Sequence, residues 1–237
     1  MHRTLKKDAE ILYDGYLYGT RTGGNIMSAR AKQSEKLRYL CLLGLFIAIE
    51  LMMKLTGLGS VPVGPLVMSF LTVPIAVGAI MMGPLAGAIM GATFGIASLI
   101  DAIQGVSLMT NAFFAVNPVS TVILCVGTRT LMGACVGWIY KALDKVDRTN
   151  TVKYFVSALS AALLNTIFFM GYIVLFFYQT DFVQNLASSK GAVNPFMFII
   201  LVVGVQGLIE AIACTIVGGG VAKGVDMALN RKNARKK

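Results

Sequence analysis

Long apolar runs follow one another from Leu37 almost to the end of the chain. Runs of about 17–25 residues, at 1.5 Å of rise per helical residue, are long enough to cross about 30 Å of hydrocarbon. The pattern therefore predicts an all-α membrane protein, a bundle of six transmembrane helices. The predicted spans are Leu37–Met53, Leu66–Met82, Pro84–Ile103, Pro118–Leu143, Tyr154–Phe177 and Phe196–Ala222.

Polar segments at the two ends predict the domain organisation. Residues 1–36 are a polar N-terminal segment, residues 37–225 hold the six-helix transmembrane domain, and residues 226–237 are a basic tail. Met27 is an alternative start, and we assign residues 1–26 no role. Between the second and third spans lies Gly83-Pro84, a turn dipeptide that predicts an antiparallel helical hairpin.

The positions of the basic residues predict the orientation of these helices. The net charge of +10 would suit a nucleic-acid-binding protein, but Lys and Arg gather in the end segments and one central loop. With the N-terminus inside, all 21 basic residues except Lys54, Arg129 and Lys190 lie at the cytoplasmic side. Both termini are therefore predicted to be cytoplasmic, and the bilayer rather than nucleic acid is the expected partner.

Motifs of enzyme chemistry are missing from the sequence. It contains no HExxH, GxSxG or P-loop pattern, and its one histidine, His2, precedes the first span. Its four cysteines occur singly inside apolar runs, without metal-ligand spacing. We therefore expect a protein that is not an enzyme and that carries no cofactor or metal.

Small residues recur every four positions in three of the spans. This spacing is typical of membrane helices that approach one another closely. On the first span the pair is Gly44 and Ala48. On the third and fourth spans, where it predicts packing inside the bundle, the residues are Gly83, Gly87, Gly91, Gly95, Gly133 and Gly137.

Three polar residues are expected at a common depth inside the membrane region. Arg129 lies near the middle of the fourth span, Asn165 in the fifth and Glu210 in the sixth. An ionisable side chain at this depth is costly and suggests a functional site. Two interpretations remain open: a cluster that binds a ligand, or an Arg129–Glu210 ion pair that only fixes helix packing.

Further polar side chains are predicted on the outer side of this cluster. Asn117-Pro118 and Asn194-Pro195 read as helix N-caps whose free N–H groups would favour an anionic group such as a carboxylate. A mixture of amide, hydroxyl, aromatic and Arg groups suits a small polar organic ligand. The candidate binding residues are Asn111, Asn117, Thr121, Arg129, Asn165, Tyr172, Gln206 and Glu210.

Several local sequences are similar to those of one transporter family. Leu71-Thr72-Val73-Pro74-Ile75, Met82-Gly83-Pro84-Leu85-Ala86-Gly87 and the glycine stripe beyond them resemble the S components of energy-coupling factor (ECF) transporters over about residues 37–225. The resemblance implies a subunit of a prokaryotic cell membrane that captures a vitamin from outside. It also implies docking on a membrane T component carried by two ATPases. Gly44 and Ala48 match the small-residue docking pair of that family, with Gly in place of the usual first Ala.

Within the family, Asn117-Pro118, Arg129 with the adjacent Leu131-Met132-Gly133, and Asn165 look most like the pantothenate-type members. Pantothenate carries a carboxylate, as the Arg and helix-terminus argument requires independently. Folate, riboflavin and pyridoxine stay open as alternatives. A carrier outside this family that uses Arg129 and Glu210 as a relay is the competing interpretation.

Overall fold

The computed structural model describes residue 33 and residues 36–63, 66–147, 149 and 151–234. The chain divides into two units, Met1–Gly44 and Leu45–Lys237. Residues 36–44 of the first unit and residues 45–55 of the second are helical, so the predicted span Leu37–Met53 falls on helical residues. Residues 1–26 and Met27 lie outside the described residues.

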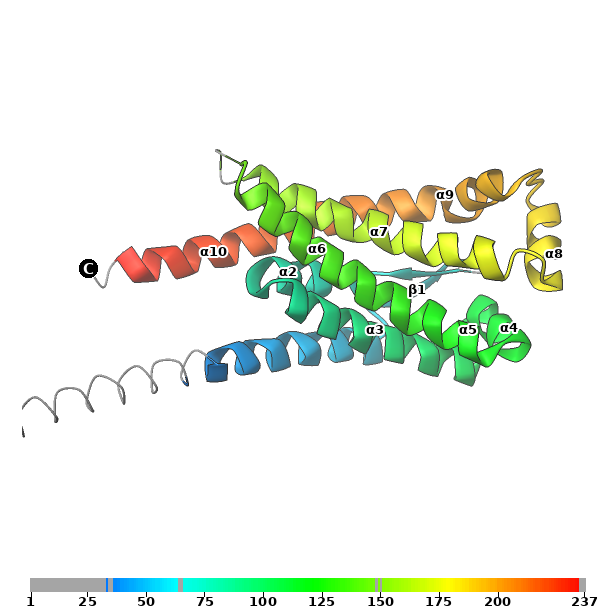
Figure 1. Ribbon diagram of the computed structural model, residues 1–237, viewed down its shortest axis with the longest axis horizontal. Coiled ribbons are helices and arrows are strands. Elements are labelled where there is room, and N and C mark those ends of the chain that lie inside the picture. The colour runs from blue at the N-terminus through cyan, green and yellow to red at the C-terminus, as the bar shows by residue number, and fades with distance from the viewer. Residues whose placement is uncertain (1–32, 34–35, 64–65, 148, 150, 235–237) are drawn as a thin grey trace, which may run out of the picture. The chain divides into compact units, whose positions relative to one another are not determined.

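The second unit consists of helices and one small β-hairpin (Figure 1). In the described residues, four helical stretches are long and apolar enough to cross a membrane: Pro84–Gln104, Pro118–Asp144, Val152–Phe176 and Gln206–Ala228. The elements are β1 (Ser60–Val63), β2 (Leu66–Ser69), α2 (Thr72–Met82), α3 (Pro84–Gln104), α4 (Leu108–Val116), α5 (Pro118–Val122), the π-helical turn η1 (Ile123–Gly127), α6 (Thr128–Asp144), α7 (Val152–Phe176), α8 (Asp181–Ser189), α9 (Pro195–Ala213), the π-helical turn η2 (Cys214–Gly218) and α10 (Gly219–Ala234).

The second predicted span is wrong in its first part. Leu66–Ser69 form strand β2, which pairs antiparallel with β1 so that Ser60 lies opposite Ser69. The helix α2 begins only at Thr72 and has 11 residues, a rise of roughly 16 Å. A short apolar run has no periodicity that separates a buried strand from a buried helix, so the sequence pattern could not find this boundary.

The hairpin of α2 and α3 is confirmed. Gly83 alone separates the two helices, with φ 91°, and α3 begins with Pro84 at its first position. Left-handed φ values are available to glycine at little cost, and proline suits the first helical turn because its missing N–H is not needed there. The Gly-Pro dipeptide therefore performs the reversal that its sequence predicts.

The fourth and sixth predicted spans depart from regular α-helix. The fourth runs from Pro118 to Asp144, but η1 interrupts it immediately before the segment that carries Arg129. The sixth is broken at Gly204, whose φ of 27° and ψ of −120° are not helical. The connections also contain the helices α4 and α8, which the apolar pattern did not predict because both are only 9 residues long.

A line of glycines holds α3 against η1 and α6, as the four-residue spacing predicts. A Cβ added to Gly87 would lie less than 3.0 Å from the backbone of Gly133, and one added to Gly91 would lie as close to the backbone of Arg129. Gly95 has the same relation to Val126. The two segments thus touch through backbone atoms, and we call this contact the glycine seam.

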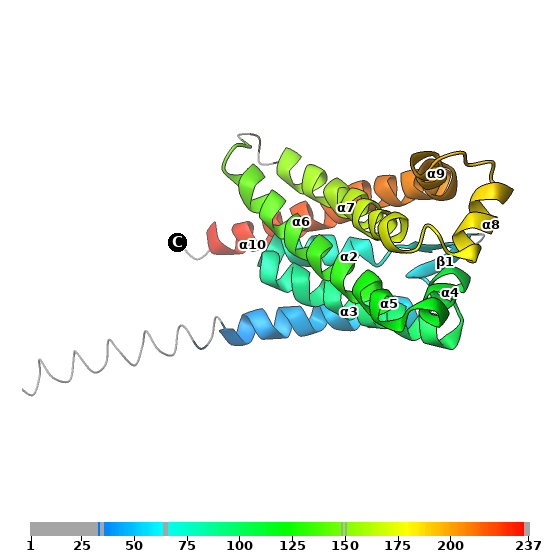
Figure 2. The same cartoon turned by 45° about the vertical axis from the view of Figure 1, so that its right-hand side comes forward.

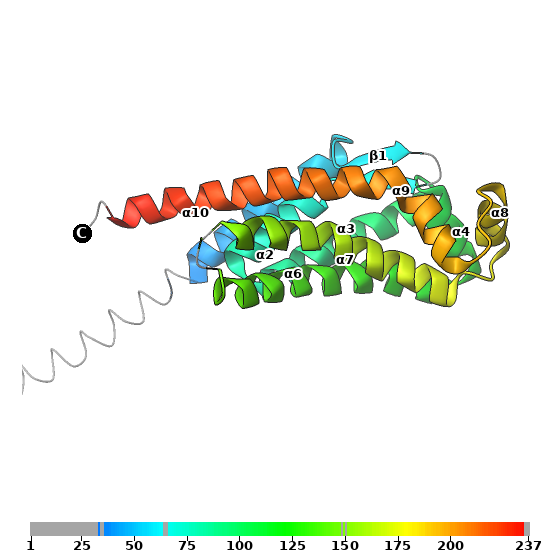
Figure 3. The ribbon, with the colours of Figure 1, turned by 90° about the horizontal axis from the view of Figure 1, so that it is seen from above.

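The connections lie at two ends of the helical unit. Figures 1 and 2 show α4 and α8 at one end, and the turn between α6 and α7 at the other, toward the C-terminal part of α10. Figure 3, from above, shows α9 and α10 following one another along the unit. In the α6–α7 turn, Asp147 accepts hydrogen bonds from Thr149 Oγ1 (2.7 Å) and the Lys153 N–H (2.9 Å), which lower the pKa of this carboxyl to about 2.

Candidate functional site

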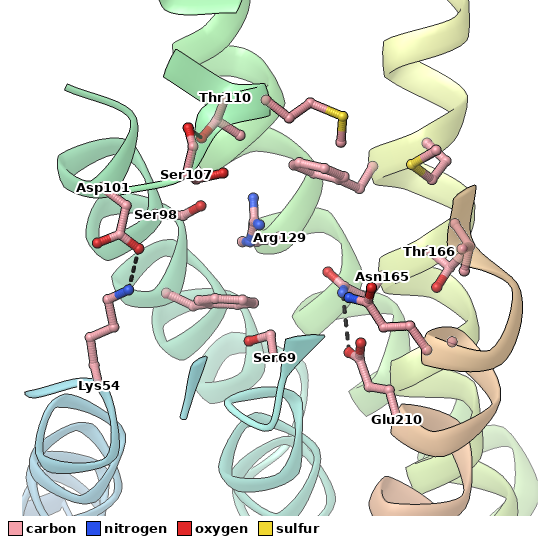
Figure 4. Close-up of a pocket in the computed structure, with 17 residues that line it drawn as sticks. Lys54, Ser69, Ser98, Asp101, Ser107, Thr110, Arg129, Asn165, Thr166 and Glu210 are labelled. Atoms are coloured by element: carbon pink, nitrogen blue, oxygen red, sulfur yellow. Dashed lines mark hydrogen bonds and ion pairs between the residues drawn. The ribbon is translucent and has the colours of Figure 1, made fainter. Parts of the chain in front are cut away.

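A cavity of about 90 Å³ lies among α3, α4, α6, α7 and α9. Its wall combines aromatic and aliphatic side chains with hydroxyl, amide and charged groups. Figure 4 shows Arg129 in the middle of this cavity, with Ser98 and Ser107 on one side and Asn165 on the other. The ionisable and amide residues of the wall are Lys54, Asp101, Arg129, Asn165, Gln206 and Glu210.

Four of the predicted site residues line this cavity together. They are Arg129 from α6, Asn165 from α7, and Gln206 and Glu210 from α9. Arg129, Asn165 and Glu210 were predicted to share one depth from their distance along each span. A common depth in three neighbouring helices is what brings their side chains to one cavity.

The other four predicted residues have different surroundings and do not line the cavity. Asn111 donates to the Ala102 carbonyl at 2.8 Å, across the turn between α3 and α4. Asn117 accepts from the Ser120 N–H at 3.1 Å, which confirms it as an N-cap. Thr121 donates to the Asn117 carbonyl at 2.9 Å. Tyr172 stacks on Phe176, with ring centroids 4.4 Å apart.

The second predicted N-cap, Asn194, is also confirmed. Its side chain accepts from the Met197 N–H at 2.7 Å, at the start of α9. Both Asn-Pro starts therefore use the Asn oxygen to satisfy one of the free N–H groups of a first helical turn. Neither Asn lines the cavity.

The Arg129 side chain is buried, with 7% of its surface exposed. Its Nη1 donates to the Cys125 carbonyl at 3.2 Å, one turn earlier. Its Cζ lies 4.4 Å from the ring centre of Phe94 and 4.6 Å from that of Phe169. Its Nε is buried and has no hydrogen-bond acceptor among the described residues.

Glu210 is buried too, but its contacts are to neutral groups. Its Oε1 accepts from Thr72 Oγ1 at 3.3 Å and from Asn165 Nδ2 at 3.4 Å. In the part of the chain that the structure describes, the ion pairs join Lys54 to Asp101 and Lys153 to Asp144, and none joins Arg129 to Glu210. Arg129 and Glu210 therefore make no direct ion pair, although the two charges lie close enough to attract each other.

The sequence pattern missed one charged contact at the cavity. Lys54 follows the first predicted span, and Asp101 lies near the end of the third. Both line the cavity and form an ion pair with each other (Figure 4). Their opposite charges at the same outer end of two spans were the available signal. Within the described residues, Arg129 is then the cation of the cavity wall that has no ion pair to a carboxylate.

An apolar cluster adjoins the cavity on the side of α4 and α8. Its buried members come from α4, η1, α7, α8 and α9 and include Phe113, Phe177, Val183 and Phe198. Met109 and Met170 belong to both the cluster and the cavity wall. Aromatic packing such as Phe113 on Phe177, with centroids 4.4 Å apart, fixes these short outer helices against the bundle.

A catalytic arrangement is not evident in this set of groups. The cavity offers hydrogen-bond donors and acceptors around one buried guanidinium, which is the chemistry of recognition. Most of these groups come from helices rather than from loops, so the site depends on how the helices pack.

Comparison with known proteins identifies the family. A search of curated proteins found no match. The family model described as "ECF transporter, substrate-specific component" matches residues 38–218, which is more than half of the chain. This range includes all the residues that line the cavity. The chain therefore belongs to the substrate-specific components of ECF transporters, a family of transport subunits.

Proposed function

We propose that this protein captures a small carboxylate-bearing vitamin, pantothenate first, from outside a prokaryotic cell. It then passes the vitamin to the cytoplasm after docking on a T component with two ATPases. Membership of the family supports the role of substrate-specific subunit. The ligand, the partners and the orientation in the membrane are our inference.

The single observation that carries the ligand proposal is that the Arg129 guanidinium is buried without an ion pair among the described residues. A buried guanidinium is expensive unless it is paired, and the contacts of Arg129 include one carbonyl and two aromatic rings, while none of the ion pairs of the described residues includes it. A carboxylate from the ligand would supply the missing charge and the acceptor for Nε. Binding would thus relieve a cost that the folded protein already bears.

Other polar groups of the cavity wall suit the rest of the ligand. Gln206 and Asn165 line the cavity with amide groups, while Ser69 and Thr166 add hydroxyls. Ser69 Oγ is buried without a hydrogen-bond partner among the described residues. A ligand with hydroxyl and amide groups behind its carboxylate, as pantothenate has, would satisfy such groups. Asn111, Asn117, Thr121 and Tyr172 would contribute only by holding the outer helices in place.

Calorimetry of the purified full chain against pantothenate, its uncharged amide analogue and folate tests this proposal. We expect pantothenate to bind most tightly, because the amide lacks the charge that Arg129 requires. Equal affinity for pantothenate and the amide would remove the carboxylate argument. Binding of folate, riboflavin or pyridoxine in place of pantothenate would reassign the vitamin and leave the transport role standing.

The proposed orientation places both termini in the cytoplasm, because nearly all basic residues then lie inside. Cysteines introduced singly at Ser60 and Ser188 should react with a membrane-impermeant thiol reagent on intact cells. A cysteine at Thr149, in the α6–α7 turn, should react only after the cells are opened. Labelling of Thr149→Cys on sealed cells would reverse the orientation.

Gly44 and Ala48 are the proposed docking face for the T component. They stand four residues apart in helical residues, and both are exposed. Such a pair lets another membrane helix approach closely. We expect Gly44→Leu combined with Ala48→Leu to abolish co-purification with the coupling module while ligand affinity stays unchanged. Normal assembly and transport by this double variant would place the docking site elsewhere.

A further inference from the structure

We propose that Phe94 and Phe169 clamp the Arg129 guanidinium so that it accepts only a flat anion in its own plane, which makes the two rings specificity-determining residues. This inference rests on the proposed function, because it concerns the same cavity and the same anionic end of the ligand. It goes further in naming how the anion is held and which anions are rejected.

Two aromatic rings from different helices pack against the guanidinium. Phe94 comes from α3 and Phe169 from α7, and each ring centre lies within 4.6 Å of Arg129 Cζ. Arginine side chains stack on aromatic faces, so we expect two rings at this distance to cover the faces of the planar cation. This leaves its edges as the route to hydrogen bonds.

One of those edges is already used and another is not. Nη1 donates to the Cys125 carbonyl at 3.2 Å, which fixes the rotation of the group about its long axis. Nε is buried and finds no acceptor among the described residues. The Nε–H and the neighbouring Nη2–H point in one direction, and a carboxylate can accept both in a side-on, bidentate contact. The geometry therefore points to this edge as the seat of the ligand's carboxylate.

The clamp selects by shape and charge together. The two oxygens of a carboxylate lie in one plane with the guanidinium, between the ring faces. A phosphonate or sulfonate carries at least one oxygen out of that plane, toward a ring. The face of an aromatic ring is negative, so it repels this oxygen. Carboxylates should thus be preferred even over anions of higher charge.

Phe94 and Phe169 are positioning residues that act on the ligand through Arg129. The experiment therefore measures selectivity between ligands as well as affinity. We would compare pantothenate, its amide and its phosphonate analogue by calorimetry, using wild type, Phe94→Leu, Phe169→Leu and Phe169→Tyr. Leucine keeps apolar bulk but removes the ring face, whereas tyrosine keeps the face. Phe168→Leu is the matched control, because Phe168 is the neighbouring half-buried ring and does not line the cavity.

We expect wild type and Phe168→Leu to prefer the carboxylate over the phosphonate by about tenfold or more. Phe94→Leu and Phe169→Leu should each reduce that ratio several-fold, and Phe169→Tyr should keep the wild-type ratio. A purely structural role of the rings would lower affinity for all three ligands in proportion and leave the ratio unchanged. That result would overturn the clamp.

A second measurement separates this inference from the identity of the vitamin. In protein labelled with ¹⁵N-arginine, the Arg129 Nε–H signal is assigned by its loss in Arg129→Lys. Acetate should shift this signal and methylphosphonate should not. A shift with acetate, together with no binding of pantothenate by calorimetry, would reject the vitamin and support the clamp. Pantothenate binding without any shift at Nε–H, or no shift with acetate, would reject the clamp.

Discussion

Replacing Gly133 by alanine is expected to destabilise the protein by about 1–3 kcal/mol, the usual cost of overpacking a close contact. The added Cβ would lie less than 3.0 Å from the backbone of Gly87, a separation that real Cβ atoms essentially never show. Backbone cannot rotate away as a side chain can, so α3 and α6 must move apart. The midpoint of thermal unfolding in detergent measures the effect, and leucine at the same position should prevent folding.

Gly171 supplies the matched control. It lies in α7, and a Cβ added there would meet nothing within 4 Å. Alanine is the better helix former by about 1 kcal/mol, so Gly171→Ala should leave stability unchanged or raise it. Equal losses in Gly133→Ala and Gly171→Ala would mean that the close contact of the glycine seam does not determine stability.

Arg129→Ala is expected to weaken pantothenate binding by roughly 10- to 150-fold, because a charge-assisted hydrogen bond contributes about 1.5–3 kcal/mol net. The amide analogue, which has no charge to lose, should be affected much less. Calorimetry with both ligands measures the difference. Arg129→Lys should not restore wild-type affinity, because an ammonium group cannot make the side-on bidentate contact of a guanidinium.

The competing explanation is that Arg129 and Glu210 act as a structural pair. Under that explanation Arg129→Ala and Glu210→Gln would each lower the unfolding midpoint, and the double variant would be no worse than either. We expect additivity instead, since no ion pair joins these two described residues and Glu210 Oε1 receives its hydrogen bonds from Thr72 and Asn165. A glutamine side chain keeps an oxygen that can accept both.

The helices that are long and apolar enough to cross a membrane were predicted well, and the shorter elements were not. The third predicted span ends within one residue of α3, since Gly83-Pro84 marks its start and a polar residue its end. By contrast, Leu66–Ser69 read as the beginning of a helix, although it is a strand. An apolar run indicates burial, and buried strands and buried helices both consist of apolar residues. Apolarity alone therefore does not distinguish the two. The break at Gly204 was hidden for the same reason, inside an apolar run.

The depth of the candidate site residues along their helices was predicted from the sequence, but the direction in which the side chains point was not. Counting residues along each span put Arg129, Asn165 and Glu210 at one level, and all three line the cavity. Thr121 and Arg129 were both predicted to bind the ligand from the fourth span, but the π-helical turn Ile123–Gly127 lies between them. A π turn holds more residues than an α turn, so it rotates the helix beyond it about the axis. No sequence signal predicts that π-helical turn.

The glycine seam separates the parts of this protein that can be redesigned from those that cannot. Along the seam, any added atom changes the spacing of two helices and with it the position of Arg129, whose backbone touches Gly91. On α7 and α9, Thr166 and Gln206 line the cavity and lie outside the seam. A library intended to give the subunit a new cargo should therefore vary these wall positions and leave the glycines alone. Arg129 would be kept or removed according to the charge of that cargo.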